Sequence, residues 1–186
     1  MNVTHLLLRQ AAERPNTLAI LERAPRRGGR SETFASLQVA SAHAAARFQA
    51  DGVRAGDAVL VFVPMSADLY VILIALFRLG AVAMFLDPSA GREHIARCCE
   101  ILPPKAMIAV PKAHLLRLTT PALRRIPLHY SVNWWLPLTK WWSRSKSFPA
   151  DMSVVTRVDD DAALITFTSG STGRPKAAAR SHGFLR

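Results

Sequence analysis

The chain has 186 residues, half of them apolar, which suffices for one folded domain with a sizeable core and excludes general disorder. It carries 24 lysines and arginines against 13 aspartates and glutamates, a net charge of +11. No acidic residue occurs between Ile101 and Ala150, where eight lysines and arginines lie. Such a field attracts phosphates, anionic lipid or nucleic acid, although a solvated or covered face is the simplest interpretation.

The first 52 residues predict two helices separated by a short strand. Thr4 can cap a first helix, which Pro15 stops. Residues 18–21 have the apolar character of a strand. A long alanine-rich helix then opens within residues 33–37, and Gly52 is a suitable end for it.

The next sixty residues alternate between strands and helices. Asp57–Val63 is a continuous apolar run of the kind found in a strand buried on both faces. Ser66 can cap a buried helix that Gly80 ends. That helix covers residues 67–79. The remaining elements expected here are a strand at 81–86, a helix at 93–101 and a strand at 106–110. This order predicts an α/β fold with a largely parallel sheet, flanking helices and ligands beyond the carboxyl ends of the strands.

The alternation fails over about residues 119–150, which contain four prolines and pairs of tryptophans among basic residues. We predict an irregular, basic, tryptophan-containing insert packed on the domain. A segment that touches a membrane surface remains the alternative, and would extend over residues 101–150. The longest charge-free apolar run, Leu69–Phe77, is too short to span a bilayer, and no secretory signal is visible. We therefore expect a cytoplasmic protein, with membrane association as an option.

Metal-binding and disulfide patterns are weak in this sequence. Cys98 and Cys99 are adjacent, which does not suit an ordinary disulfide. His94 precedes Cys98 by one helical turn, but no further ligand follows with a recognisable spacing. We predict no metal site within these residues. Nucleic acid ranks last among partners because no recognition motif accompanies the positive charge.

A short glycine- and hydroxyl-rich loop follows an apolar strand expected at 162–167, and it is the strongest indication of function in the sequence. Its glycines let backbone N–H groups converge on an anion, its hydroxyl groups add donors, and its lysine adds a compact positive charge. The loop spans residues 168–176 and consists of Thr168, Ser169, Gly170, Ser171, Thr172, Gly173, Arg174, Pro175 and Lys176. Its spacing differs from the Walker A motif, but its composition predicts a polyphosphate site.

The nine-residue string resembles the signature phosphate loop of the adenylate-forming superfamily, which includes acyl-CoA synthetases, luciferases and peptide-synthetase adenylation domains. That pattern runs Thr-Ser-Gly-Ser/Thr-Thr-Gly-x-Pro-Lys-Gly, and this sequence matches it through Lys176, with Ala177 in place of the last glycine. Weaker matches occur in the expected order along the whole of residues 1–186, so the resemblance implies the N-terminal, AMP-binding part of this fold.

A narrower resemblance points to the branch of fatty-acid–CoA ligase-like proteins that contains the olefin-biosynthesis β-lactone synthetases. The segments that carry it are Leu86–Pro88 with Gly91–Arg92, Val110–His114 and Ser181–Phe184. The resemblance implies an AMP-forming ligase that activates a carboxylic acid, fatty or β-hydroxy fatty, with ATP and Mg²⁺. The acyl group would then pass to CoA or, in the β-lactone branch, close on its own β-hydroxyl.

By the same resemblance, Thr168–Gly173 and Lys176 would hold the β- and γ-phosphates of ATP, and Arg174 would have no assigned role. His182, just after the loop, is interpreted as a structural histidine. The family's adenine and ribose motifs, metal-binding glutamate, acyl pocket and catalytic lysine are expected beyond these residues. We therefore predict no catalytic residue within this chain and no adenylation by it alone. The alternative is an inactive remnant that binds a membrane surface or a partner.

Overall fold

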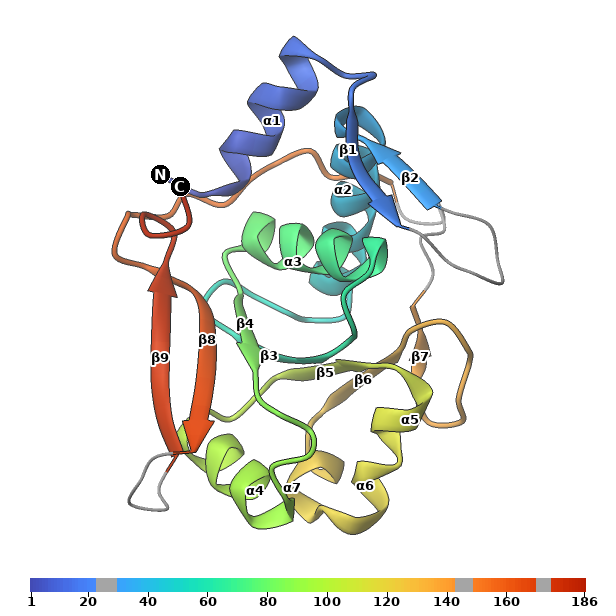
Figure 1. The fold of residues 1–186 in the computed structure, drawn as a ribbon, viewed down its shortest axis with the longest axis vertical. Coiled ribbons are helices and arrows are strands. Elements are labelled where there is room, and N and C mark those ends of the chain that lie inside the picture. Colours follow the sequence, from blue (N-terminus) through green and yellow to red (C-terminus); the bar gives the residue numbers. More distant parts are fainter. Residues whose placement is uncertain (23–29, 143–148, 170–174) are drawn as a thin grey trace.

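A computed structural model describes residues 1–22, 30–142, 149–169 and 175–186, and Figure 1 shows the fold. Its helices are α1 Thr4–Glu13, α2 Phe34–Ala50, α3 Ala67–Leu79, α4 Arg92–Ile101, α5 Pro111–His114, α6 Leu116–Thr119 and α7 Pro121–Arg124. Its strands are β1 Leu18–Glu22, β2 Arg30–Thr33, β3 Ala58–Phe62, β4 Val82–Phe85, β5 Ala106–Ala109, β6 Leu128–Ser131, β7 Lys140–Trp141, β8 Ala162–Ser169 and β9 Pro175–Ser181.

A seven-stranded sheet forms the centre of the part that the structure describes. Its strand order is β7-β6-β5-β3-β4-β8-β9, and every neighbouring pair is parallel except β8 with β9. Strands β1 and β2 form a separate antiparallel ribbon. Helices α1, α2 and α3 lie toward one side of the sheet, and α4 to α7 lie toward the other (Figure 1). The predicted α/β class with a largely parallel sheet is confirmed.

The predicted centre of the chain forms as its local signals indicate. Strand β3 is buried at every position. The Ser66 hydroxyl accepts a hydrogen bond from the Leu69 N–H at 3.2 Å, which caps the first turn of α3. Gly80 adopts the left-handed conformation (φ 67°) that ends this helix, and its N–H donates to the carbonyls of Leu76 and Phe77. These caps turn the chain directly from α3 into β4.

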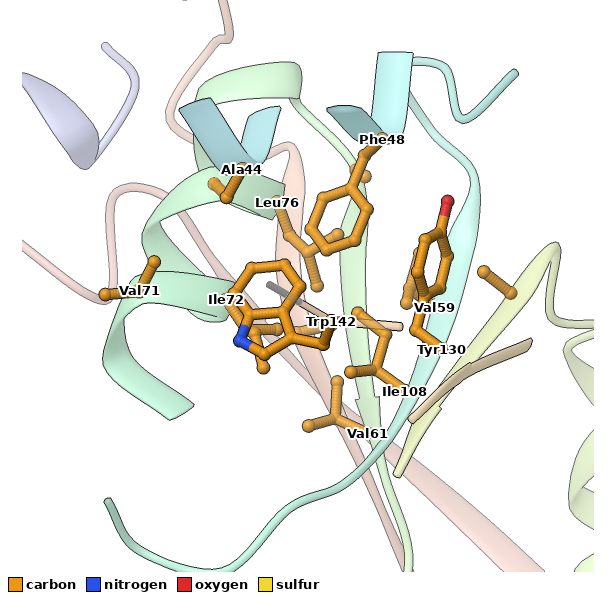
Figure 2. Packing of buried hydrophobic residues seen from close by; sticks show 14 of the residues in the cluster. Ala44, Phe48, Val59, Val61, Val71, Ile72, Leu76, Ile108, Tyr130 and Trp142 are labelled. Atoms are coloured by element: carbon orange, nitrogen blue, oxygen red, sulfur yellow. The ribbon is translucent and has the colours of Figure 1, made fainter. Parts of the chain in front are cut away.

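Apolar side chains fill both faces of the sheet. On one face, Phe48 of α2 and residues of α3 pack against the strands (Figure 2). The Phe48 ring stacks on Trp142 with 5.5 Å between centroids and meets Tyr130 edge-on at 5.2 Å. The other face has a smaller cluster whose members include Leu60, Met84, Ile95, Met107 and Leu123. Burial of both faces explains why the central strands are apolar throughout.

The start of α1 differs from the prediction. Thr4 is buried and its hydroxyl has no hydrogen-bond partner among the described residues, so it does not cap the helix. The Asn2 side chain binds the start of the helix instead, since its Oδ1 accepts a hydrogen bond from the Thr4 N–H at 3.0 Å. Its Nδ2 donates to the carbonyls of Phe77 at 2.7 Å and Val155 at 2.9 Å. One buried amide therefore joins the amino end, α3 and the segment before β8.

The segment 119–150 is more regular than predicted. It contains α7 and two strands, β6 and β7, which extend the parallel sheet beyond β5. The sequence hides β6 because His129 and Ser131 interrupt its apolar pattern, although both are buried. Trp142 is also buried, whereas Trp134 and Trp135 are exposed. The expected insert is thus partly a continuation of the sheet and partly a surface loop.

Candidate functional site

The predicted phosphate loop connects the two strands of an antiparallel hairpin, β8 and β9. Residue pairs along the hairpin run from Ala162 opposite Ser181 to Ser169 opposite Pro175. Thr168 lies opposite Lys176, and both residues are exposed. Since directly paired residues project from the same face of a sheet, the hairpin presents a hydroxyl and an ammonium group side by side at the ends of the loop.

Four of the predicted site residues, Gly170–Gly173, lie outside the described residues, as does Arg174. The described ends fix where the loop must start and finish. Ser169 is the last residue of β8, and Lys176 is the second residue of β9. The sequence predicts a strand before the loop, but it does not predict the antiparallel strand that follows the loop. Pro175 conceals this return, because proline is uncommon inside strands.

The hairpin places the described ends of this loop at the carboxyl edge of the parallel sheet. Strand β8 pairs in parallel with β4, and β4 pairs in parallel with β3. The end of β8 therefore lies at the same edge as the carboxyl ends of β3, β4 and β5. Ligands of open α/β sheets bind outside this edge. The described ends of the loop thus lie at the edge where the sequence order predicts that ligands bind.

A groove of about 620 Å³ opens at the same edge. Its walls come from the segments that leave β3, β4 and β5 at their carboxyl ends, and its lining includes Pro64, Leu86, Ser89, Val110 and Lys112. Most of these groups are apolar, and Lys112 adds a positive charge. The sequence alone does not predict this groove. The available signal was that each lining segment directly follows a buried strand.

Comparison with known proteins identifies the family to which this chain belongs. A family model described as "AMP-binding enzyme" matches residues 7–185. The chain belongs to the AMP-binding enzyme family. An olefin β-lactone synthetase from Stenotrophomonas maltophilia is 30% identical over 194 residues, which cover 97% of this chain and 35% of that protein. One from Xanthomonas campestris is 30% identical, with 97% of this chain and 34% of that protein covered.

Solved structures of adenylate- and CoA-ester-forming enzymes share the fold. The acetoacetyl-CoA synthetase of Streptomyces lividans superposes with a TM-score of 0.86 at 23% identity, covering 98% of this chain and 30% of that protein. The chain thus spans about a third of the length of the relatives it matches. The resemblance drawn from the loop sequence and the fold implied by it are both confirmed.

In this family member, a tight turn shapes one wall of the groove. Asp87 Oδ1 accepts hydrogen bonds at 2.7 Å from both the backbone N–H and the hydroxyl of Ser89. The Ser89 hydroxyl and then its N–H hold the pKa of the Asp87 carboxyl below its ordinary value. The carboxylate is therefore fixed in a turn after β4 and is already occupied by local donors.

His182 stands at the end of β9 away from the loop. It is completely buried, and its Nδ1 accepts a hydrogen bond from the Val3 N–H at 3.3 Å. Its ring meets Phe77 edge-on at 6.0 Å between centroids, and burial lowers the pKa of the imidazole. These contacts join the hairpin to the amino end of the chain. The interpretation of His182 as a structural residue is supported by this position.

The adjacent cysteines belong to the core. Cys98 and Cys99 are both free and buried, and burial raises the pKa of each thiol to about 11. Such thiols are poor nucleophiles and poor metal ligands at neutral pH. Among the described residues, no group of three or more His, Cys, Asp or Glu side chains is arranged to hold a metal ion. No helix in the described ranges is long and apolar enough to cross a membrane.

Proposed function

We propose that this chain forms the ATP-phosphate-binding part of an AMP-forming ligase. The ligase would activate a carboxylic acid, fatty or β-hydroxy fatty, to an acyl-adenylate and then transfer the acyl group to CoA. One observation carries the proposal: the family's phosphate-loop sequence joins β8 to β9 at the carboxyl edge of the sheet, with Thr168 and Lys176 paired at its ends. Helix-flanked parallel sheets place phosphates at this edge.

The proposed adenylation needs this chain to stabilise negative charge on the leaving pyrophosphate, and it needs no nucleophile from this chain. A carboxylate oxygen of the substrate forms a bond to the α-phosphorus of ATP, and the bond from that phosphorus to the pyrophosphate oxygen breaks. Negative charge then grows on the leaving pyrophosphate. The Lys176 ammonium, the Thr168 and Ser169 hydroxyls and the backbone of Gly170–Gly173 would hold that charge in place. The chain's proposed role is to bind and orient the phosphates.

Mg²⁺ fits this proposal through the substrate. Mg²⁺ keeps several waters and is commonly bound by one or two carboxylates together with phosphate oxygens of the nucleotide. The described residues provide no carboxylate cluster at the hairpin, but the loop hydroxyls are oxygen donors of the kind that Mg²⁺ accepts. We propose that the ion enters with ATP, where it would neutralise phosphate charge.

β-Lactone formation is the second candidate, and the two synthetases at 30% identity favour it. In this route the β-hydroxyl oxygen of the acyl-adenylate forms a bond to its own acyl carbon. The bond from that carbon to the AMP oxygen breaks, AMP leaves, and the hydroxyl proton passes to a base. The two routes share the adenylation step, so the phosphate site proposed for this chain serves both.

The test is a calorimetric titration of the 186-residue chain with ATP and with pyrophosphate, each in the presence of Mg²⁺. We expect binding by the natural chain and a dissociation constant roughly tenfold higher for Lys176→Ala, since a hydrogen bond to a charged group contributes about 1.5–3 kcal/mol. Arg174→Ala is the matched control, because it removes a positive charge from a position that varies in the family's pattern.

Two outcomes would contradict the proposal. One is the absence of measurable binding of either ligand by the natural chain when circular dichroism shows it to be folded. The other is an equal weakening by Arg174→Ala and Lys176→Ala, which would indicate a diffuse attraction to positive charge in place of a phosphate site.

A further inference from the structure

The connection between β6 and β7, residues 132–139, exposes unusually large apolar side chains. We call it the tryptophan loop. The exposed fractions are 64% for Trp134, 63% for Trp135 and 89% for Leu138, the last being the highest among the large apolar residues that the structure describes. The loop projects from the β7 edge of the sheet, beside α5 (Figure 1). Large exposed apolar groups that gather on one loop mark an interaction site.

Internal contacts hold the tryptophan loop in this shape. The Ser131 hydroxyl donates to the Trp134 carbonyl at 2.6 Å, and the Thr139 hydroxyl donates to the Leu136 carbonyl at 2.7 Å. Asn133 and Leu138 both have positive φ angles, 77° and 61°. For leucine this conformation costs about 1 kcal/mol or more. The fold therefore holds an apolar side chain in water at a conformational cost, which folding alone does not explain.

The charge around the loop indicates what it meets. Residues 101–150 contain eight lysines and arginines and no acidic residue. Lys112, Arg124 and Arg125 of this segment are exposed. Helix α5 follows β5, the parallel neighbour of β6, and His114 Nε2 lies 3.0 Å from the Tyr130 carbonyl. Helix α5, which carries the exposed Lys112, therefore lies beside the strand that leads into the loop, and the positive charge of residues 101–150 attracts an anionic partner.

Tryptophan next to lysine and arginine is the composition that membrane interfaces select. The indole ring has an apolar body and a polar N–H, which suits the headgroup region, and cations bind the phosphates of anionic lipids. We propose that the tryptophan loop is a peripheral membrane anchor. It would insert Trp134, Trp135 and Leu138 into the headgroup region of an anionic bilayer, while exposed cations of residues 101–150, Lys112 of α5 among them, contact lipid phosphates. This inference does not depend on the proposed ATP chemistry.

The experiment is co-sedimentation of the 186-residue chain with vesicles of phosphatidylcholine, alone and mixed with phosphatidylglycerol. We expect binding to the anionic vesicles, weaker binding at high salt, and a shift of tryptophan emission to shorter wavelength on binding. The double variant W134S/W135S should bind at least roughly tenfold more weakly, because two large apolar groups no longer leave water. Both positions are exposed, so circular dichroism should show an unchanged fold.

Phe184→Ser is the matched control, since Phe184 is 72% exposed and lies beyond β9, at the opposite edge of the sheet. It should bind the vesicles as the natural chain does. Failure of the natural chain to bind anionic vesicles would overturn the proposal. So would equal binding by W134S/W135S, which would mean that charge alone attracts the membrane. Sedimentation velocity provides a further check: a dimer that W134S/W135S dissociates would assign the loop to a second copy and also overturn it.

Discussion

The centre of the sheet and its β6–β7 edge are built in different ways. Strands β3, β4 and β5 are almost entirely apolar, and the helix between β3 and β4 has a clear cap at each end. The edge strands β6 and β7 are short and carry histidine, serine, tyrosine and lysine. Among the described residues, side-chain hydrogen bonds and an ion pair attach this edge to the rest of the molecule. The centre therefore depends on how much apolar surface it buries, whereas the edge depends on particular polar partners.

Asp51, at the end of α2, is the main attachment of the edge. Its Oδ2 accepts a hydrogen bond from the Tyr130 hydroxyl at 2.6 Å, and Oδ1 forms an ion pair with Lys140. Arg47 adds a contact at 3.0 Å. Burial alone would raise the pKa of the Asp51 carboxyl, but the hydrogen bonds from Lys140, Tyr130 and Arg47 together outweigh burial and lower it. One carboxylate thus holds both β6 and β7 to α2.

Removing this carboxylate should have the largest effect on the edge. We expect Asp51→Ala to lower the free energy of unfolding by about 2 kcal/mol, because the buried Tyr130 hydroxyl loses its acceptor and the ion pairs of Asp51 with Lys140 and Arg47 are removed. Urea unfolding at pH 7 measures the change. Tyr130→Phe should cost less, about 1 kcal/mol, since Asp51 keeps its two cationic partners.

Glu100→Ala provides the matched control, because Glu100 is an exposed carboxylate on α4. A loss for Asp51→Ala no larger than that for Glu100→Ala would remove the distinction between the two regions. It would mean that apolar packing of Phe48, Tyr130 and Trp142 alone secures the edge.

This contrast also explains how far the sequence could predict the structure. The helix at 67–79 was predicted to the residue, because Ser66 and Gly80 act within one turn of it. Strand β6 was missed, because His129 and Ser131 interrupt its apolar pattern and its Tyr130 hydroxyl pairs with Asp51, 79 positions away in the chain. No local pattern encodes such a partner. The candidate site follows the same rule, since the loop is a local motif, whereas the groove combines segments from three strands.

Two buried histidines give the edge a second, pH-dependent attachment. His114 Nε2 lies 3.0 Å from the Tyr130 carbonyl, and His129 Nε2 lies 2.9 Å from the Leu123 carbonyl. The two rings are 6.2 Å apart. Burial is the main cause that lowers the pKa of each ring, and the charge of Arg117 lowers both further. Both therefore fold as neutral imidazoles that donate to backbone carbonyls.

The sign of the pH dependence follows from these lowered pKa values. In the unfolded chain a histidine takes up a proton at about pH 6.5, whereas the folded rings do so only at lower pH. Their stabilising contribution is complete above the unfolded value and is lost as the pH falls toward the folded values. We expect the natural chain to lose on the order of 1 kcal/mol between pH 7 and 5 through this pair, allowing for solvent screening.

Urea unfolding at a series of pH values checks this prediction. The double variant H114Q/H129Q can keep a donor to each carbonyl but cannot titrate, so its stability should vary less over this range. His182 is also buried with a lowered pKa, and H182Q measures its separate share. The exposed His5→Gln is the control. An unchanged slope for H114Q/H129Q would show that the edge has no acid-sensitive attachment there.

The smallest expected effect is also the most informative about why the edge differs from the centre. Leu138→Asn should raise the free energy of unfolding by about 0.5 kcal/mol, because asparagine tolerates a φ of 61° better than leucine and Leu138 is too exposed to contribute packing. Leu115→Asn is the control, since Leu115 is 61% exposed at an ordinary φ of −61°. It should be neutral or slightly destabilising.

A gain at position 138 without a gain at 115 would mean that the chain keeps leucine in the tryptophan loop against its own stability. In the centre, each apolar residue is explained by the surface it buries. At position 138 that explanation fails, and contact with an apolar surface outside these residues, such as the proposed membrane, would account for the leucine. A loss of stability for Leu138→Asn would instead place the side chain within the chain's own packing, and the two regions would then differ in strength alone.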